Sequence, residues 1–266
     1  MQKSKEPLKA RPITNNVFSE LPLQVVIPFK NNHVDVSKLL DEIYAIKNVR
    51  LSITLVDDNS SNPVFIKQYE HIPFVSCHRF DEDKGFGYCV NHAVKNGKPN
   101  IVFVMHSDVY ALPKNIFRDL ALALHYGVKD KVAMVSAMVD KPMPKSCKEL
   151  IINPNADTDK YYELLQSDAF SPLICTAFSK TAFAKVGGLP SYPYCWYEDK
   201  LLNEKFRAFG YNVGISTRVT VRHHGGKTIS ELLQKKPAIA EIIKSNKTRY
   251  LSESELLKAA AEKIKK

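Results

Sequence analysis

Carboxylates and histidines directly follow apolar runs in this sequence, where they could bind a metal ion or move protons. The stretch VFVMHSDVY (102–110) turns from apolar to polar at His106 and Asp108. Asp108 offers a hard oxygen ligand for a divalent cation, whereas His106 can ligate manganese but suits magnesium poorly. Taken alone, the stretch is equally consistent with a strand that ends in a polar turn.

A second candidate is the acid pair within GGLPSYPYCWYEDKLLNEKFRAFGY (187–211). Glu198 and Asp199 stand in the first turn of a predicted amphipathic helix, where the helix dipole favours acids for structural reasons alone. The aromatic approach YCWY also suits a sugar site. Apolar walls around a carboxylate raise its pKa towards that of a useful general base.

Two further stretches carry polar groups and glycines before or after predicted strands. In LVDDNSS (55–61), Asp57 and Asp58 could bond a ribose or a base, or could form an Asx-turn at a solvated strand end. In DEDKGFGYCVNHAV (81–94), Gly85 and Gly87 allow a close backbone approach before a helix. Because the full dinucleotide-binding fingerprint is lacking, this stretch by itself predicts only a turn.

The last candidate is the histidine pair in VTVRHHGGKT (219–228). His223 and His224 follow a predicted strand and precede two glycines. Histidines so placed can bind a metal or donate to a phosphate, although a pair of surface histidines usually does neither.

Alternating strand and helix patterns must position these residues. The first half predicts buried strands and amphipathic helices in turn. The strands are 23–28, 51–58, 74–80 and 101–106, and the helices are 35–48, 88–96 and 113–126. This order predicts an α/β fold with a mostly parallel central sheet flanked by helices, with ligands outside the carboxyl ends of the strands.

The second half is less regular. Strands are predicted at 132–139 and 172–179, separated by a long polar stretch, 141–170, that is either an acceptor-binding loop or a variable insertion. A helix at 198–210 places Leu202, Phe206 and Phe209 on one face and ends at Gly210. From Ser230 the chain is Lys-rich and helix-prone.

Composition limits the classes of protein that this chain can be. Its 266 residues suit one large α/β domain, or one domain with a small extension. The net charge of +10 favours nucleotides, nucleic acid or anionic membranes as partners, or reflects a generally basic surface. With no apolar run near the roughly 20 residues of a membrane span, and no signal-peptide pattern, we expect a cytoplasmic protein. The five scattered cysteines form no CxxC pair, which favours reduced thiols in a cytosolic setting and argues against a cysteine-based zinc site.

Taken in order, six stretches resemble glycosyltransferase family 2 with a GT-A fold: VVIPFKNN, LVDDNSS, DKGFGYCVNHAV, FVMHSD, the acid-pair helix and VRHHGG. The resemblance runs from about Leu23 to Thr228. It implies a Rossmann-like GT-A domain over 23–229, after a loose N-terminal arm (1–22) and before a Lys-rich helical extension (230–266).

The resemblance also implies roles for particular residues. The nucleotide-binding positions are Pro28 and Asp58, the loop beside the base contains Asp83 and Gly85, the metal-binding acid is Asp108, the catalytic base is Asp199 with Glu198 beside it, and the late metal or diphosphate ligand is His223 or His224. His106 is a departure, because family members usually have an acid there. A histidine in place of the acid removes a negative charge, which leaves the identity of the metal open. His106 would then either assist in metal binding or contact the nucleotide-sugar donor.

The function implied is an inverting, metal-dependent transfer of a sugar from a nucleotide-sugar donor, such as a UDP-sugar, to an acceptor hydroxyl. The cation would be Mn²⁺ or Mg²⁺, and the acceptor a glycan or a lipid-linked sugar, with peripheral membrane contact left open. One alternative is a virus-like enzyme that glycosylates a hydroxymethylated base in DNA. Another is a non-catalytic binder of nucleotide or nucleic acid. The oligomeric state is not predicted.

Overall fold

The computed structural model describes residues 21–140, 160–166, 169–225 and 238–265. The expected N-terminal arm lies almost wholly outside these residues. So do most of the polar stretch 141–170 and the expected boundary between 229 and 230.

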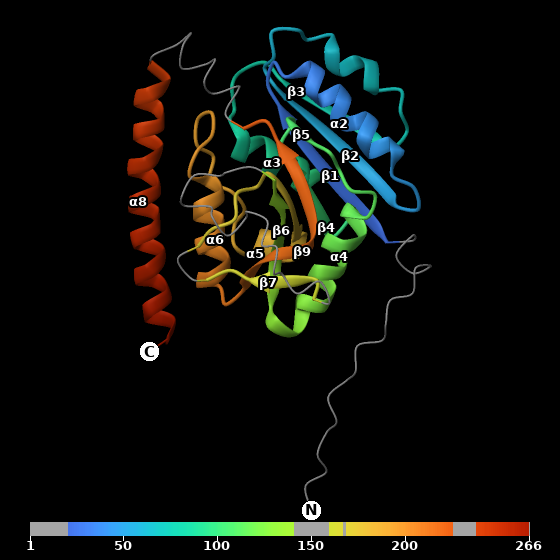
Figure 1. Cartoon of the computed structure of the whole chain (residues 1–266). Coiled ribbons are helices and arrows are strands. Elements are labelled where there is room, and N and C mark those ends of the chain that lie inside the picture. The colour runs from blue at the N-terminus through green and yellow to red at the C-terminus, as the bar shows by residue number, and fades with distance from the viewer. Residues whose placement is uncertain (1–20, 141–159, 167–168, 226–237, 266) are drawn as a thin grey trace, which may run out of the picture.

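The described elements alternate between strands and helices over most of the chain (Figure 1). In chain order they are β1 (Pro22–Phe29), α2 (His33–Ala45), β2 (Arg50–Asp58), η1 (Phe65–Tyr69), β3 (Val75–Phe80), α3 (Phe86–Asn96), β4 (Ile101–Met105), β5 (Val109–Tyr110), α4 (Ile116–Tyr126), η2 (Gly127–Asp130), β6 (Val132–Val139), β7 (Tyr162–Leu164), β8 (Cys175–Ser179), α5 (Lys180–Lys185), α6 (Glu198–Ala208), β9 (Asn212–His223) and α8 (Ala238–Lys265).

The strands form one sheet in the order β3-β2-β1-β4-β8-β6-β9-β5, with β7 added on β9. Strands β1 to β4 pair in parallel, so their carboxyl ends meet at one edge, as expected. Strand β8 runs antiparallel to both β4 and β6, while β6 and β9 are parallel. The predicted α/β class is therefore confirmed, although the sheet is mixed rather than wholly parallel. Its parallel part contains β2 and β4, which are followed by the candidate residues Asp58 and Asp108.

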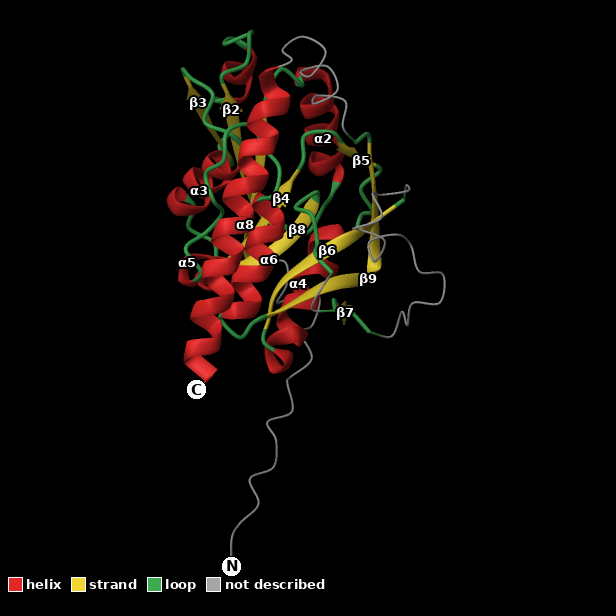
Figure 2. Cartoon of the chain, turned by 90° about the vertical axis from the view of Figure 1, so that its left-hand side faces the viewer, coloured by secondary structure: helices red, strands yellow, loops and turns green. Residues whose placement is uncertain are grey.

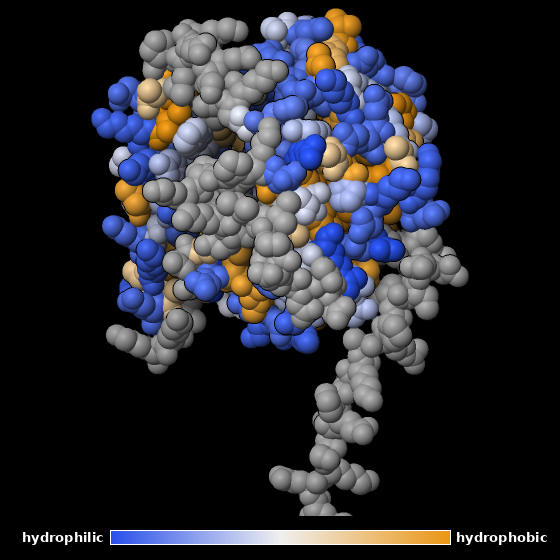
Figure 3. Space-filling model, in the orientation of Figure 1, coloured by the Kyte–Doolittle hydropathy of each residue, from blue (hydrophilic) through white to orange (hydrophobic). Residues whose placement is uncertain are grey.

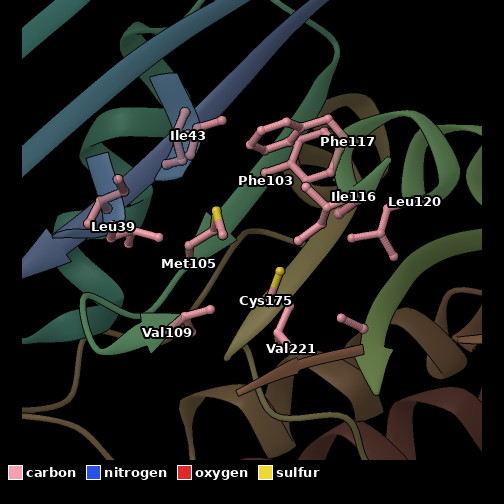
Figure 4. Close-up of a cluster of buried hydrophobic side chains, with 14 of the residues drawn as sticks. Leu39, Ile43, Phe103, Met105, Val109, Ile116, Phe117, Leu120, Cys175 and Val221 are labelled. Carbon is pink, nitrogen blue, oxygen red and sulfur yellow. The ribbon is translucent and has the colours of Figure 1, made fainter. Parts of the chain in front are cut away.

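Helices cover both faces of the sheet (Figures 1 and 2). Alternate strand residues point to opposite faces. Val25 and Ile27 therefore pack with α2 and α4, while Val26 packs with α3, α5 and α6. Figure 4 shows the first of these clusters, where Phe103 of β4 meets Phe117 of α4 edge to face, with ring centroids 5.1 Å apart. Burial on both faces explains why the strands read as continuous apolar runs.

Several element boundaries differ from those predicted. Helix α4 begins at Ile116 rather than at Pro113, whose carbonyl accepts a hydrogen bond from the Ile116 N–H in a preceding turn (3.0 Å). Strand β8 is shorter than the predicted 172–179, and the short strands β5 and β7 were not predicted. Phe209, expected on the apolar face of α6, is 47% exposed because the helix ends at Ala208.

Helix α8 lies within the predicted C-terminal extension and stands beside α6 (Figure 2). No helix in the described part of the chain combines the length and apolar character needed to cross a membrane. On the face shown in Figure 3, the described surface is mostly hydrophilic, with small separate hydrophobic groups.

Candidate active site

Three candidate ligands converge beyond the end of β4. His223 Nε2 lies 2.9 Å from Asp108 Oδ1 and 3.2 Å from His106 Nδ1. One possible ligand atom from each residue fits within 4.8 Å of the other two. His106 and Asp108 come from the turn after β4, and His223 ends β9, so residues more than 110 positions apart in the chain meet here.

Electrostatics keeps this group in a metal-compatible protonation state. Burial disfavours the charged imidazolium, and His223 adds to this effect, so the pKa of His106 falls to about 4. Burial alone would raise the pKa of Asp108, but the hydrogen bond and charge of His223 outweigh it and lower that pKa to about 2. The group therefore offers a neutral imidazole and an ionised carboxylate at neutral pH.

The strand geometry separates the two adjacent histidines. Along β9, Val219 and Val221 are buried and His223 follows them at the same two-residue period. His223 pairs with Val109 of β5 and so points towards Asp108. His224 is exposed and stacks on Tyr110, with ring centroids 4.4 Å apart. The structure thus brings His223, and not His224, to the candidate metal group.

The acids that end β2 hold two loops in place. Asp58 accepts hydrogen bonds from the backbone N–H groups of Lys84 (2.7 Å) and Gly85 (3.0 Å). Asp57 is fully buried, accepts from the Ser60 N–H (2.8 Å) and forms an ion pair with Arg79. Asp58 therefore connects the end of β2 by hydrogen bonds to the loop that contains Gly85 and Gly87, called the glycine loop below.

The glycine loop approaches another part of the same protein very closely. A Cβ on Gly85 would lie 2.3 Å from the carbonyl oxygen of Tyr192, and one on Gly87 would lie 2.1 Å from that of Pro190. Between them, the Phe86 N–H donates to the carbonyl of Tyr194 (2.7 Å). The close approach expected from Gly-x-Gly is present, and its partner here is the segment 190–194 that leads to the acid pair.

That segment has an unusual backbone. Tyr194, Trp196 and Tyr197 all have positive φ angles, of 64°, 97° and 74°. Bulky residues rarely adopt this region, at a cost of about 1–3 kcal/mol each, and such residues cluster at active sites and ligand clamps. The strained backbone comes immediately before α6, whose first two residues are Glu198 and Asp199.

Burial perturbs both acids of this pair. Glu198 is 2% exposed, and burial, with a contribution from Asp199, raises its pKa to about 8. Its Oε1 atom has no hydrogen-bond partner among the described residues. Asp199 is less enclosed and accepts from the Lys200 N–H (2.8 Å), and burial raises its pKa to about 6. At neutral pH, Glu198 is mainly protonated and Asp199 is mainly ionised.

The remaining expected nucleotide positions lie in different surroundings. Pro28 is buried within β1, opposite Val56 of β2. Asp83 accepts a hydrogen bond from the side chain of Asn59 (3.0 Å) and forms an ion pair with Lys30.

Other polar residues at the strand ends were not singled out from the sequence. Asn31 follows β1 with φ 56° and accepts from the N–H and hydroxyl of Ser61 (2.7 and 2.9 Å). The Asn32 side chain donates to the Ser107 hydroxyl (3.0 Å). The signal was the run KNN after the first strand, which parallels DNSS after the second.

A continuous series of contacts links the expected residues. Asp58 bonds to Gly85, and the ring of Phe86 lies against that of His106, with centroids 5.3 Å apart. His106 contacts His223. On the other side, the Gly85–Gly87 loop touches the segment that carries the acid pair. The nucleotide, metal and acid-pair candidates therefore lie in one connected region near the carboxyl edge of the parallel strands.

The donor set fits a divalent cation. One carboxylate oxygen and two imidazole nitrogens are close enough to share an ion. This mixture of ligands suits Mn²⁺ better than Mg²⁺, which prefers oxygen ligands.

Comparison with known families identifies the class of protein. A model of glycosyl transferase family 2 matches residues 24–187, which is more than half of the chain. The chain therefore belongs to glycosyl transferase family 2, and the resemblance drawn from its motifs is confirmed. No curated protein sequence matches the chain significantly.

Solved structures share the GT-A fold with this chain at low sequence identity. A mannosyltransferase, PcManGT from Pyrobaculum calidifontis, in complex with GDP-Man and Mn²⁺, has a TM-score of 0.61 and 17% identity over 97% of this chain and 79% of its own. S. aureus TarS 1–349 has a TM-score of 0.60 and 15% identity over 80% of this chain and 63% of its own. The same protein in complex with UDP-GlcNAc has a TM-score of 0.60 and 14% identity, with 79% and 61% covered. This chain thus spans less than two thirds of the TarS structures.

Proposed function

We propose that this protein is an inverting glycosyltransferase that moves a sugar from a nucleotide-sugar donor to an acceptor hydroxyl. The observation that carries the proposal is the meeting of His106, Asp108 and His223 at the strand edge. A group of this composition at that edge suits a cation and the diphosphate of a nucleotide sugar. The donors held by similar structures, UDP-GlcNAc and GDP-Man, support the same class of substrate.

In the proposed reaction, Asp199 accepts the proton of the acceptor hydroxyl. The acceptor oxygen bonds to the anomeric carbon as the bond from that carbon to the diphosphate breaks. The electron pair of the broken bond leaves with the nucleoside diphosphate. Attack from the face opposite the leaving group inverts the anomeric configuration.

The two acids of the pair suit different roles. A general base must be ionised at working pH and reachable by substrate, and Asp199, with a pKa of about 6 and partial exposure, meets both conditions. Glu198 is buried and keeps its proton at neutral pH. We assign Asp199 as the base and Glu198 as a neutral neighbour that accepts or donates a hydrogen bond within the site.

The other residues bind and orient the donor. Asp58 fixes the glycine loop, and the nucleoside would lie beside this loop with Asp83 nearby. Pro28 lies in β1, next to this part of the proposed donor site. A divalent cation held by Asp108 and His223, with His106 beside them, would neutralise negative charge on the diphosphate.

The test is a panel of UDP- and GDP-sugars, each assayed for donor hydrolysis and transfer with Mn²⁺, with Mg²⁺ and with EDTA. We expect turnover with at least one donor, strongest with Mn²⁺ and lost in EDTA. Asp199→Asn should lower kcat by about 10²–10⁴-fold with donor binding retained, because only the base is removed. Donor binding without turnover under every condition would instead indicate the non-catalytic binder.

For the acceptor, we propose a glycan or lipid-linked sugar, with DNA bearing hydroxymethylated bases as the competing substrate. Transfer of a radiolabelled sugar into organic-extractable lipid or oligosaccharide is the expected outcome. Label that instead enters hydroxymethylated duplex DNA, and resists extraction, would replace this acceptor assignment with the DNA one.

A further inference from the structure

Helix α8 is a single helix whose buried residues lie on one narrow face. Ile239, Asn246, Tyr250 and Ser254 are each no more than 5% exposed, while most of their neighbours in the helix are exposed. Spacings of seven, four and four residues place them on the same side of a helix. Asn246, at 1% exposed, is an amide in a position where apolar side chains are usual.

The Asn246 amide group spans the strained segment before the acid pair. Its Nδ2 atom donates to the carbonyl of Pro193 (2.9 Å) and to that of Cys195 (3.2 Å). These two carbonyls lie on either side of Tyr194, whose φ is 64°. The Asn246 side chain thus bonds to the backbone both before and after Tyr194, the residue at which the chain enters the left-handed region.

Neighbouring contacts fix the position of α8 relative to this segment. The Tyr250 ring stacks on Tyr197, with centroids 5.3 Å apart and planes 16° apart. The Tyr250 and Ser254 hydroxyls donate to the Glu204 carboxylate of α6, at 2.6 and 2.5 Å. Figures 1 and 2 both show α8 running alongside α6.

The segment is held from the opposite side as well. The Phe86 N–H of the glycine loop donates to the carbonyl of Tyr194, so this carbonyl is bonded from the side of that loop. The flanking carbonyls of Pro193 and Cys195 are bonded on the α8 side. The turn that leads into Glu198 and Asp199 is therefore fixed between the nucleotide loop and the last helix.

We propose that Asn246 is a positioning residue for sugar transfer: by bonding both carbonyls around Tyr194, it holds the left-handed turn that aims the acid pair into the site. This inference rests on the proposed glycosyltransferase function. Asn246 touches no reacting atom, so its effect passes entirely through the segment 193–197. A residue with this role should influence the chemical step more than donor binding.

The test compares Asn246→Ala with Ser254→Ala in the full chain. Both changes truncate a buried polar side chain on the same face of α8, but the Ser254 hydroxyl donates to Glu204 of α6, whereas Asn246 donates to the segment before the acid pair. We expect Asn246→Ala to lower kcat at least tenfold with less than a threefold change in donor KM. Ser254→Ala should stay within twofold for both. Asn246→Leu, which nearly keeps the volume but has no hydrogen-bond donor, should match Asn246→Ala and serves if the alanine variant does not fold.

Two further readouts separate positioning from a loss of stability. Loosening the segment admits water to Asp199, so the acidic limb of the kcat–pH profile should move to lower pH in Asn246→Ala and stay in place in Ser254→Ala. Hydrogen exchange of the amides of residues 194–199 should be faster only in the Asn246 variants. Equal kcat losses in the two alanine variants, or unchanged exchange at 194–199, would overturn the proposal.

The exchange measurement also distinguishes this inference from the proposed function. If the wild-type chain transfers no sugar but exchange at 194–199 rises only in the Asn246 variants, the function fails and the positioning contact stands. If the wild type transfers sugar and the Asn246 variants behave like Ser254→Ala, the function stands and the positioning role fails.

Discussion

At the scale of single residues, burial of the acid pair costs the folded state free energy. Glu198 is buried with an oxygen that has no partner among the described residues. Such a group costs free energy unless a ligand or a proton satisfies it. A protein that keeps two poorly solvated carboxyls side by side bears this cost for a use other than stability.

This cost predicts the pH dependence of stability. Burial raises the pKa of Glu198 to about 8 in the folded state, from its ordinary value of 4.5 in the unfolded chain. The folded state therefore binds more protons between these values and loses stability as pH rises through them. Glu198→Gln removes the ionisation, so at pH 9 its free energy of unfolding should exceed that of the wild type by on the order of a few kcal/mol, and its Tm should be higher. The two should agree at pH 4.

Thermal melts from pH 4 to pH 9 measure this difference. Glu70→Gln, at an exposed position, is the matched control and should show no such trend. A Glu198→Gln protein that is less stable than the wild type at pH 9 would contradict the assigned burial of an ionisable group.

A second residue-scale prediction concerns the two histidines. His223→Ala removes a ligand from the candidate metal group, whereas His224→Ala removes only a ring stacked on Tyr110. We expect Mn²⁺ to raise the Tm of the wild type and of His224→Ala in the presence of nucleoside diphosphate, but not that of His223→Ala. Calorimetric titration with Mn²⁺ gives the same comparison directly. Equal Mn²⁺ binding by the two variants would exclude His223 as a ligand.

At the scale of elements, two glycines with different surroundings test the contact between the nucleotide loop and the acid-pair segment. A Cβ on Gly87 would meet the Pro190 carbonyl at 2.1 Å, whereas a Cβ on Gly210 would have nothing within 4 Å. Gly210→Ala should cost only about 1–2 kcal/mol, for its φ of 77°. Gly87→Ala should destabilise by about 1–3 kcal/mol through overpacking and also weaken donor binding.

Denaturant unfolding and donor titration together measure these effects. Donor affinity should be unchanged in Gly210→Ala and reduced in Gly87→Ala, because Gly87, unlike Gly210, packs against the segment 190–194. Unchanged donor affinity in both variants would show that this contact does not shape the donor site.

Elements also mark how far the sequence could predict the structure. Continuous apolar runs and helical spacing were sufficient for β1 to β4 and for the placement of Asp58 at the end of β2 and of Asp108 just after β4. The direction of β8 could not be read, because its five residues carry no signal of which neighbour they will join. The choice between His223 and His224 required the register of β9 against β5. The partner of Gly85 and Gly87 lies about a hundred residues further along, beyond the reach of local patterns.

At the scale of the whole molecule, charge predicts the behaviour of the protein at surfaces. The chain carries a net charge of +10, and α8 exposes Lys244, Lys247, Lys258 and Lys263. We expect it to sediment with vesicles of anionic lipid at about 50 mM salt and to be released at about 500 mM, where screening is strong. Vesicles of zwitterionic lipid are the control. Equal sedimentation with both kinds of vesicle, or sedimentation that does not change with salt, would contradict electrostatic binding to the anionic lipid.

The contact between Asn246 and the carbonyl of Cys195 joins residues 51 positions apart in the chain. During synthesis, the acid pair leaves the ribosome well before α8, by roughly 3–10 s at 5–20 residues per second. In that interval the parallel strands can pair and the nucleotide loop can form, while the turn before Glu198 lacks the amide that spans it. On the proposed roles, the candidate donor residues are therefore in place before the turn at the acid pair gains its bonds to Asn246, and docking of α8 is the step that completes this turn.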